Sequence, residues 1–374
     1  MVLRAVVAAA ALVVATTTAA CNTQGKFTSN AKTEAQDNFD RIHAGTEFDQ
    51  ANRQYRLGDF ERALESIDQS IQLVPGVAKC YLLRGKILIE LGRHTEAIDV
   101  LEFGSLFDQG NYEFPYMCGV VHEQLGLLDL ALEDFDFALS LDVEEPSTRL
   151  ALAEVLVQLD RIDEAKDVLT SGTGWTKGEA GFRQALGHIA LLEGDKEEAK
   201  RAFGEAAILS PRDPGILEDL FRVQVESNEF SDAIRTIGDI EETTYYKSRP
   251  DVQRLHALCL IQIRKPVEAR AILRDLTSRE GELVNFESWR LMSEVAILLN
   301  DDYLLRTAGN RMVQSEPTRS EGFLAKAVAQ RIEGDLDGAL ASVRLAVARA
   351  GDDPTPRRFE ELILEELASA PAVE

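Results

Sequence analysis

An alanine that recurs every 34 residues is the feature that most limits how this chain can fold. It stands at the same place in six successive segments, at Ala63, Ala97, Ala131, Ala165, Ala199 and Ala233. A turn-forming residue lies five positions before each alanine, as Gly58 lies before Ala63. Later copies continue the series at Ala269, Leu305 and Ala339. A fixed period of this length indicates stacked repeats that share a continuous core, not a set of separate globular domains.

The first copy shows why each unit is expected to form two helices. Gly58 allows a tight turn, and Phe60 begins a helix whose small and apolar residues recur on one face. Pro75 ends that helix. The first helix of most copies is marked by a small residue seven positions before the turn, at Ala51, Gly85, Gly119, Ala153, Gly187, Ala257, Ser293 and Ala327.

Paired helices, a 34-residue period, small residues at helix contacts and a closing proline resemble the tetratricopeptide repeat (TPR) family. The resemblance covers about residues 44–353. It implies an all-α fold, a right-handed superhelical solenoid of about nine helix–turn–helix repeats. Residues 354–374 are expected to form a C-terminal capping helix and a short tail, with Phe359, Leu362, Ile363 and Leu367 on the apolar side.

The register loosens after the sixth copy. Residues 241–246 lengthen the spacing to 36, and the next junction is lengthened as well. In the eighth copy, Leu305 and Gly309 occupy second-helix places that elsewhere hold a small and a bulky residue. We expect an irregular junction there that could act as a hinge.

Residues 1–20 resemble a bacterial lipoprotein signal peptide. Arg4 is followed by an apolar run that is too short for a stable membrane span, then by small residues and Cys21. The resemblance implies that Cys21 is lipidated and anchors the protein to the cell envelope. Asn22 is not the aspartate associated with inner-membrane retention, so we expect outer-membrane anchoring facing the periplasm. An ordinary cleaved signal with an incidental cysteine is the alternative.

The segment 21–43 links this cysteine to the repeats. Its polar part, residues 22–35, is expected to be a flexible tether. Phe39 and Ile42 are expected to begin an early helix that packs on the first repeat.

Charge and motifs argue against several functions. A net charge of −24 disfavours a nucleic-acid partner, because phosphate binding needs a positive surface. The acidic residues are expected mainly to keep a long solenoid soluble, and a dedicated acidic docking face is the alternative. No metal-binding, nucleophile or cofactor-loop motif is found around the histidines, so we expect no enzyme, no cofactor and no metal. An enzyme or small-molecule-binding protein with a cryptic site in the groove, for example around His188 and Glu154, is the alternative.

Three cysteines remain besides Cys21. Cys80, Cys118 and Cys259 fall in first helices of different repeats, without a CxxC pair. We interpret them as buried, reduced thiols that pack as small apolar residues.

The TPR resemblance implies that first helices line a concave face. In repeats one to three, the residues expected to face that groove are Phe48, Asn52, Tyr55, Leu82, Leu83, Lys86, Ile89, Tyr116, Met117, Val120 and Glu123. Several are apolar or aromatic where a solvated face would be polar, which suits an extended peptide or partner helix. An alternative with equal support is that some of these residues pack on a neighbouring repeat or on residues 36–43.

Together these features predict a non-catalytic scaffold for protein–protein interaction. Its partners are expected to be proteins or peptides of the cell envelope, in outer-membrane, pilus or secretion, or cell-wall assembly. Self-assembly through the solenoid ends is a further alternative, disfavoured by the charged C-terminal segment.

Overall fold

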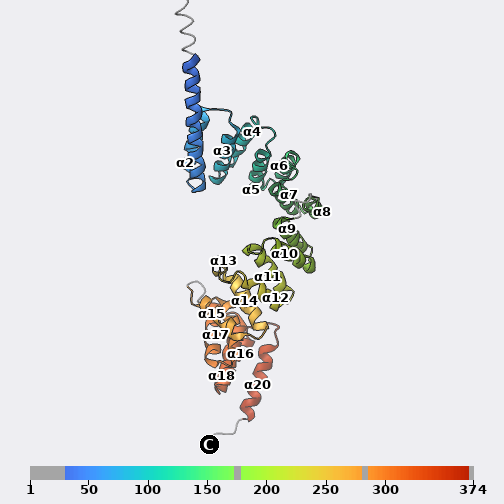
Figure 1. The fold of residues 1–374 in the computed structure, drawn as a ribbon. Coiled ribbons are helices and arrows are strands. Elements are labelled where there is room, and N and C mark those ends of the chain that lie inside the picture. Colours follow the sequence, from blue (N-terminus) through green and yellow to red (C-terminus); the bar gives the residue numbers. More distant parts are fainter. Residues whose placement is uncertain (1–29, 172–177, 280–284, 370–374) are drawn as a thin grey trace, which may run out of the picture. The chain divides into compact units, whose positions relative to one another are not determined.

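The computed structural model describes residues 30–171, 178–279 and 285–369, and every regular element in these ranges is a helix (Figure 1). The chain divides into two compact units, residues 1–177 and 178–374. The expected all-α class is confirmed, and the helices follow one another as helix–turn–helix pairs. Residues 1–20, Cys21 and the tail 370–374 lie outside the described residues.

The first unit contains four helix pairs. The first pair is formed by residues 30–56 and α2 (Phe60–Leu73). The next pairs are α3 (Ala78–Glu90) with α4 (His94–Ser105), α5 (Glu113–Gln124) with α6 (Leu128–Leu141), and α7 (Pro146–Gln158) with α8 (Ile162–Thr170). From α2 onward each helix packs on the next, and α5 also contacts α3 and α7, so consecutive first helices touch.

The second unit continues the same pattern with five pairs among its described residues. These are α9 (Ala180–Leu192) with α10 (Lys196–Leu209), α11 (Pro214–Glu226) with α12 (Phe230–Gly238), α14 (Pro250–Gln262) with α15 (Pro266–Thr277), α16 (Phe286–Leu299) with α17 (Asp302–Ser315), and α18 (Ser320–Ile332) with α19 (Leu336–Val347). A one-turn helix, α13 (Thr244–Lys247), accounts for the lengthened spacing after the sixth repeat.

The recurrent small residue marks the closest approach of two paired helices. A Cβ atom on Gly85 would lie 2.5 Å from a methyl carbon of Leu101 on the paired helix. On Gly119 it would lie 2.7 Å from the ring of Phe135, and on Gly187 it would lie 2.5 Å from the ring of Phe203. In these three pairs a bulky second-helix side chain therefore packs directly on a first-helix glycine.

The eighth repeat forms a continuous part of the stack. Leu305 is buried with Ala296 and Ala325, where most copies have an alanine. A Cβ on Gly309 would lie 2.9 Å from the backbone nitrogen of Lys326, so α17 and α18 approach each other backbone to backbone. The glycine is needed for that crossing, and α17 packs on both α16 and α18. The eighth repeat therefore uses different residues at its helix contacts, but α16, α17 and α18 remain packed on one another.

The N-terminal helix differs from the prediction. Residues 30–35, expected to belong to a flexible tether, are helical and continue to residue 56. Their alanines, lysine and glutamate have high helix propensity. Phe39 and Ile42 are 62% and 73% exposed, so they do not pack on the first repeat as expected. The paired helix α2 is too short to cover them, because its last turn reaches only Ala44, whose carbonyl accepts a 2.8 Å bond from Ser70 Oγ.

The C-terminal helix α20 (Thr355–Ser369) covers the last pair. Ile363 is fully buried against Ala327, Ala339 and Val343, with Phe359 and Leu367 beside it. Arg331 donates two bonds of 3.0 and 2.9 Å from Nε to the Glu366 carboxylate. The expected capping role fits this packing, although Leu362 is exposed instead of joining the apolar side.

Candidate protein-binding surfaces

The candidate groove residues lie on the first helices of repeats one to three, and the glycine contacts described above fix those of repeats two and three. They share one flank of each helix, beside the small residue that seats the second helix. The structure confirms their helical placement, on residues 30–56, α3 and α5. The side chains differ in their exposure to solvent, and only the more exposed ones are able to contact a partner.

The aromatic members of this face are half-buried. The Lys79 ammonium lies 4.3 Å from the centroid of the Phe48 ring. The Tyr55 ring centroid is 5.8 Å from that of Phe60, and the Tyr116 centroid is 5.6 Å from that of Phe135. Burial raises the pKa of both tyrosines above the usual value. Each ring is therefore held in place on one side while part of it stays open.

Leu82 and Leu83 do not line an open groove. They are only 8% and 7% exposed. Leu83 packs in the core with Ala51 and Ile67, and Leu82 packs with Phe114 on the next first helix. Ile89 is partly buried against both of these clusters. The alternative of packing on a neighbouring repeat holds for these residues, because α3 lies between two other first helices.

Two charged members of the set connect neighbouring first helices. Lys86 Nζ lies 2.7 Å from Glu113 Oε2, so α3 is tied to α5. Gln158 Nε2 donates a 2.7 Å bond to Glu123 Oε1, which ties α7 to α5. The half-exposed residues left on this face are Phe48, Asn52, Tyr55, Tyr116, Met117 and Val120.

A closed ion network occupies the corresponding first helices of the second unit. Buried Glu218 on α11 accepts bonds from Arg222 Nε at 2.7 Å, Arg249 Nη2 at 2.8 Å and the Tyr245 hydroxyl at 2.6 Å. Asp251 on α14 accepts from the same two arginines, which hold the pKa of its carboxyl far below the usual range. Two carboxylates balance two guanidinium groups, and the network clamps α11 to the start of α14.

This network was not predicted from the sequence, because it joins residues that are far apart along the chain. Glu218 and Arg249, for example, are separated by 31 positions. The only local signals were the i,i+4 spacing of Glu218 and Arg222 and the Arg–Pro–Asp run at 249–251. Neither signal shows that the two segments meet.

The histidine considered for an enzymatic site is engaged in a surface pair. His188 Nε2 lies 3.1 Å from Asp219 Oδ2, and Gln184 Nε2 donates to the same oxygen at 2.7 Å. Glu154 belongs to the other unit of the chain. In the described ranges no group of three or more His, Cys, Asp or Glu side chains is arranged to hold a metal ion.

The three described cysteines are buried free thiols. Burial raises the pKa of Cys118 and of Cys259 to about 12, and raises that of Cys80 as well. The interpretation of these residues as reduced packing groups is confirmed.

Comparisons with known proteins identify the repeats. Two family models described as tetratricopeptide repeat match residues 48–102 and 146–169. A curated relative, the DnaJ homolog subfamily C member 7 homolog of Schizosaccharomyces pombe, is 23% identical over 161 residues, which are 42% of this chain and 34% of the relative. The chain thus spans about a third of that relative's length.

The chain is also similar to several solved structures, some of which are described as TPR proteins. YrrB, described as a TPR protein with an unusual peptide-binding site, is 24% identical, with 46% of this chain and 87% of YrrB covered and a TM-score of 0.37. A TPR protein from Parabacteroides merdae is 12% identical, with 86% and 99% covered and a TM-score of 0.43. Pseudomonas aeruginosa pilF is 16% identical, with 66% and 95% covered and a TM-score of 0.43.

Proposed function

Because the chain carries tetratricopeptide repeats, we propose that it is a non-catalytic scaffold that binds extended peptides or helices of other proteins. The binding surface is the first-helix face of repeats one to three. The observation that carries this proposal is the set of partly open aromatic and apolar side chains there, above all Phe48, Tyr55 and Tyr116. These rings are already fixed by contacts on one side. When the exposed side buries apolar area against a partner, little side-chain entropy is lost.

The proposal includes a location. Lipid on Cys21 anchors the protein to the bacterial cell envelope, on the outer membrane facing the periplasm, and its partners are envelope proteins of outer-membrane, pilus or secretion, or cell-wall assemblies. The order of Arg4, an apolar run, small residues and Cys21 supports this address. In the part of the chain that the structure describes, no helix combines the length and apolar character of a membrane span.

Site-specific photo-crosslinking in the producing cell tests the binding surface. A photoreactive amino acid is placed at Asn52 or Val120, and in the control at Glu65, which is exposed on α2. We expect both face positions to form a covalent adduct with the same protein and the control to form none. No adduct at either face position, or the same adduct at Glu65, would contradict the assigned surface.

Membrane fractionation tests the anchor separately. Cys21→Ser is expected to move the protein from the membrane to the soluble fraction, because the lipid attachment atom is lost. Cys80→Ala, which changes a buried thiol, serves as the matched control and should stay with the membrane. Membrane association of the Cys21→Ser protein would refute lipid anchoring and leave the crosslinking result untouched.

A further inference from the structure

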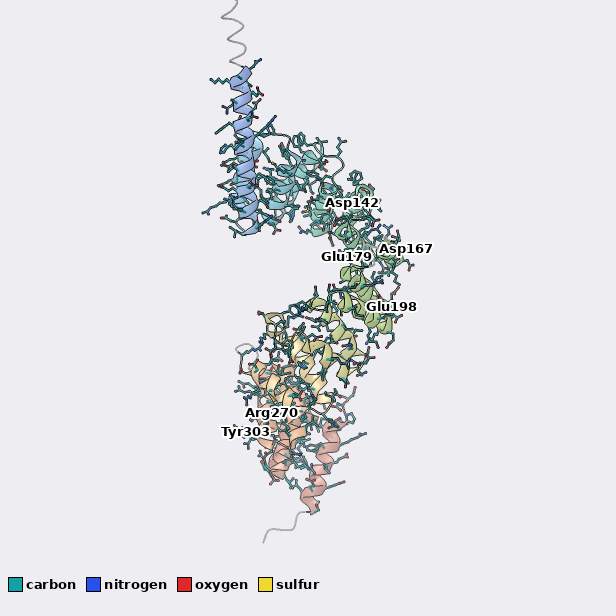
Figure 2. The ribbon with its side chains drawn as sticks, in the orientation of Figure 1. Asp142, Asp167, Glu179, Glu198, Arg270 and Tyr303 are labelled. Atoms are coloured by element: carbon teal, nitrogen blue, oxygen red, sulfur yellow. The ribbon has the colours of Figure 1, made fainter. Side chains whose placement is uncertain are left out.

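One stretch of this chain carries acidic residues without any basic residue between them. Residues 94–148 contain thirteen aspartates and glutamates and no lysine or arginine. The stretch covers α4, α5, α6 and the turn into α7, all in the first unit. Asp142, directly after α6, and Asp167, on α8, are labelled in Figure 2. Solubility does not require such a one-sided distribution, because the opposite charges elsewhere in the chain are interspersed.

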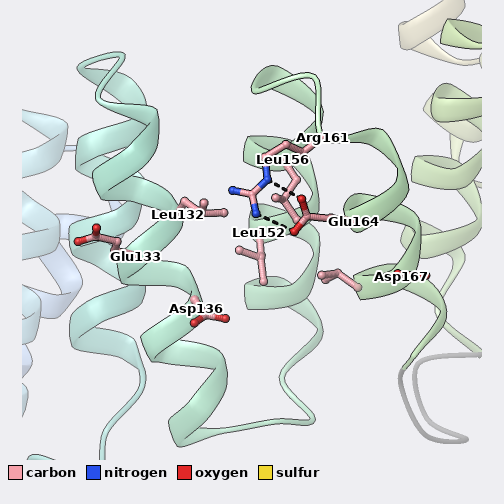
Figure 3. Close-up of a pocket in the computed structure, with 9 residues that line it drawn as sticks. Leu132, Glu133, Asp136, Leu152, Leu156, Arg161, Glu164 and Asp167 are labelled. Atoms are coloured by element: carbon pink, nitrogen blue, oxygen red, sulfur yellow. Dashed lines mark hydrogen bonds and ion pairs between the residues drawn. The ribbon is translucent and has the colours of Figure 1, made fainter.

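Beside this stretch, α6, α7 and α8 enclose an open groove of about 410 Å³. Figure 3 shows α7, which carries Leu152 and Leu156, standing between the two second helices α6 and α8. The floor is apolar and consists of Leu132, Leu152, Leu156 and Val168. The rim carries Glu133 and Asp136 from α6 and Asp167 from α8.

One arginine also reaches the rim, and its charge is already compensated. Arg161 donates to both Glu164 oxygens, at 2.7 Å from Nε and 2.6 Å from Nη2. This pairing raises the pKa of Arg161 and lowers that of Glu164. Lys166, also on α8, has an interaction of its own. Within the described ranges, Glu133, Asp136 and Asp167 have no ion-pair partner, so the rim has three uncompensated negative charges.

An apolar floor beneath an acidic rim matches one kind of side chain. Lysine and arginine lay aliphatic stems on apolar surface and keep the charged head at its edge. Further apolar surface is available on α6, where Leu130 and Phe137 are 44% and 56% exposed. A segment that alternates basic and apolar residues along a helix would meet the groove and these side chains together.

We propose that the groove between α6 and α8 is a second docking site, which binds a basic amphipathic segment of a partner protein. A lysine or arginine of that segment lies along the partly exposed Leu132 and Val168, above the buried Leu152 and Leu156, with its charge between Asp136 and Asp167. The rim of this site lies on the second helices α6 and α8, and its floor includes α7 of the fourth repeat, so it shares no residue with the first-helix face of repeats one to three and does not depend on it. Charge complementarity fixes the class of partner and speeds its association.

Fluorescence anisotropy with a labelled synthetic helix of leucine and lysine tests the site on the purified chain. The variant Asp136→Asn/Asp167→Asn removes two exposed carboxylates without changing the apolar floor. We expect its affinity for the peptide to fall about tenfold or more. The control Glu61→Gln/Glu65→Gln removes the same charge from α2, and we expect less than about a twofold change there.

Zero-length carbodiimide crosslinking adds the position of the peptide. Mass spectrometry should find peptide lysines joined to Asp136, Asp167 or Glu133. Equal losses of affinity in the two variants, or crosslinks spread over all acidic helices, would overturn the proposal in favour of general charge attraction. Self-association in sedimentation that disappears in Asp136→Asn/Asp167→Asn would overturn it in favour of a second copy of the chain as occupant.

Discussion

Nine turns between paired helices, in the described part of the chain, each hold one residue in the left-handed region of backbone conformation. Five are glycines, from Gly58 at φ 77° to Gly334 at φ 83°. The others are Asp160, Asn228, Arg264 and Asn300, with φ between 53° and 62°. Aspartate and asparagine tolerate this conformation, whereas arginine has a Cβ and no short polar group to relieve the strain. Arg264 is therefore the least suited residue at these turns.

Arg264→Gly is expected to raise the free energy of unfolding by about 1 kcal/mol, because glycine adopts positive φ without a Cβ clash. The Arg264 side chain is exposed, so few contacts are lost. Urea unfolding of the two proteins measures the change. Gly58→Ala provides the converse control and should lower stability by a similar amount. A destabilised Arg264→Gly protein would show that the side chain, not the backbone, dominates at this turn.

A buried histidine should make the second unit sensitive to acid. Burial lowers the pKa of His256 to about 4, and its Nδ1 lies 2.9 Å from the Tyr246 hydroxyl. The unfolded chain takes up this proton near pH 6.5, so the folded state loses stability as the pH falls from about 6.5 to about 4. The loss amounts to roughly 3 kcal/mol at the acid end of this window.

His256→Gln keeps a hydrogen-bonding group but cannot be protonated in this range. Urea unfolding at pH 7 and at pH 4.5 should show a smaller loss of stability for the variant than for the parent chain. An identical pH dependence in the two proteins would mean that other groups account for the acid sensitivity.

At the scale of the helix pair, the close packing of two helices depends on a glycine at the point where they meet. Gly119 on α5 faces the Phe135 ring, which is fully buried. Gly204 on α10 is also within a helix, but a Cβ added there would meet nothing within 4 Å. Both glycines lower the stability of their helix through the backbone to the same extent, but only Gly119 has a side chain packed against it. Comparing the two therefore separates the effect of helix propensity from the effect of packing.

Gly119→Ala is expected to destabilise the chain, because overpacking of about 1–3 kcal/mol exceeds the gain of up to about 1 kcal/mol in helix propensity. Gly204→Ala should stabilise it by about 0.5–1 kcal/mol. Thermal unfolding followed by circular dichroism compares them. A shift of the same sign in both variants would show that the Gly119–Phe135 contact relaxes easily.

The helix pairs could be predicted because their spacing is local. The positions of Gly58, Ala63 and their copies report a turn and a contact within about forty residues of chain. The burial of Leu82 and Leu83 could not be predicted, because it depends on how closely consecutive first helices approach. The Glu218 network depends on the same approach, and the α6–α8 groove depends on how closely neighbouring second helices approach. The length of the helix over residues 30–56 was missed because polar residues with high helix propensity give no apolar pattern.

At the scale of the whole molecule, the described core lies between helices of the same repeat and of adjacent repeats. Each described hydrophobic cluster lies within one of the two units and involves consecutive repeats. Such a core is narrow and leaves long helix faces at the surface. The first-helix face of repeats one to three and the acidic groove of α6–α8 are two such surfaces with different chemistry, one aromatic and one negatively charged.

The most direct test of the scaffold account uses the partner identified by crosslinking. Tyr116→Glu and Val120→Glu place charge on the first-helix face, and Tyr303→Glu makes the matched change at an exposed tyrosine of α17. The purified proteins are compared for binding of that partner, with circular dichroism as the check on folding. The account predicts that both face variants lose at least about tenfold in affinity at unchanged helicity, while Tyr303→Glu binds normally. Normal binding by the face variants would contradict it.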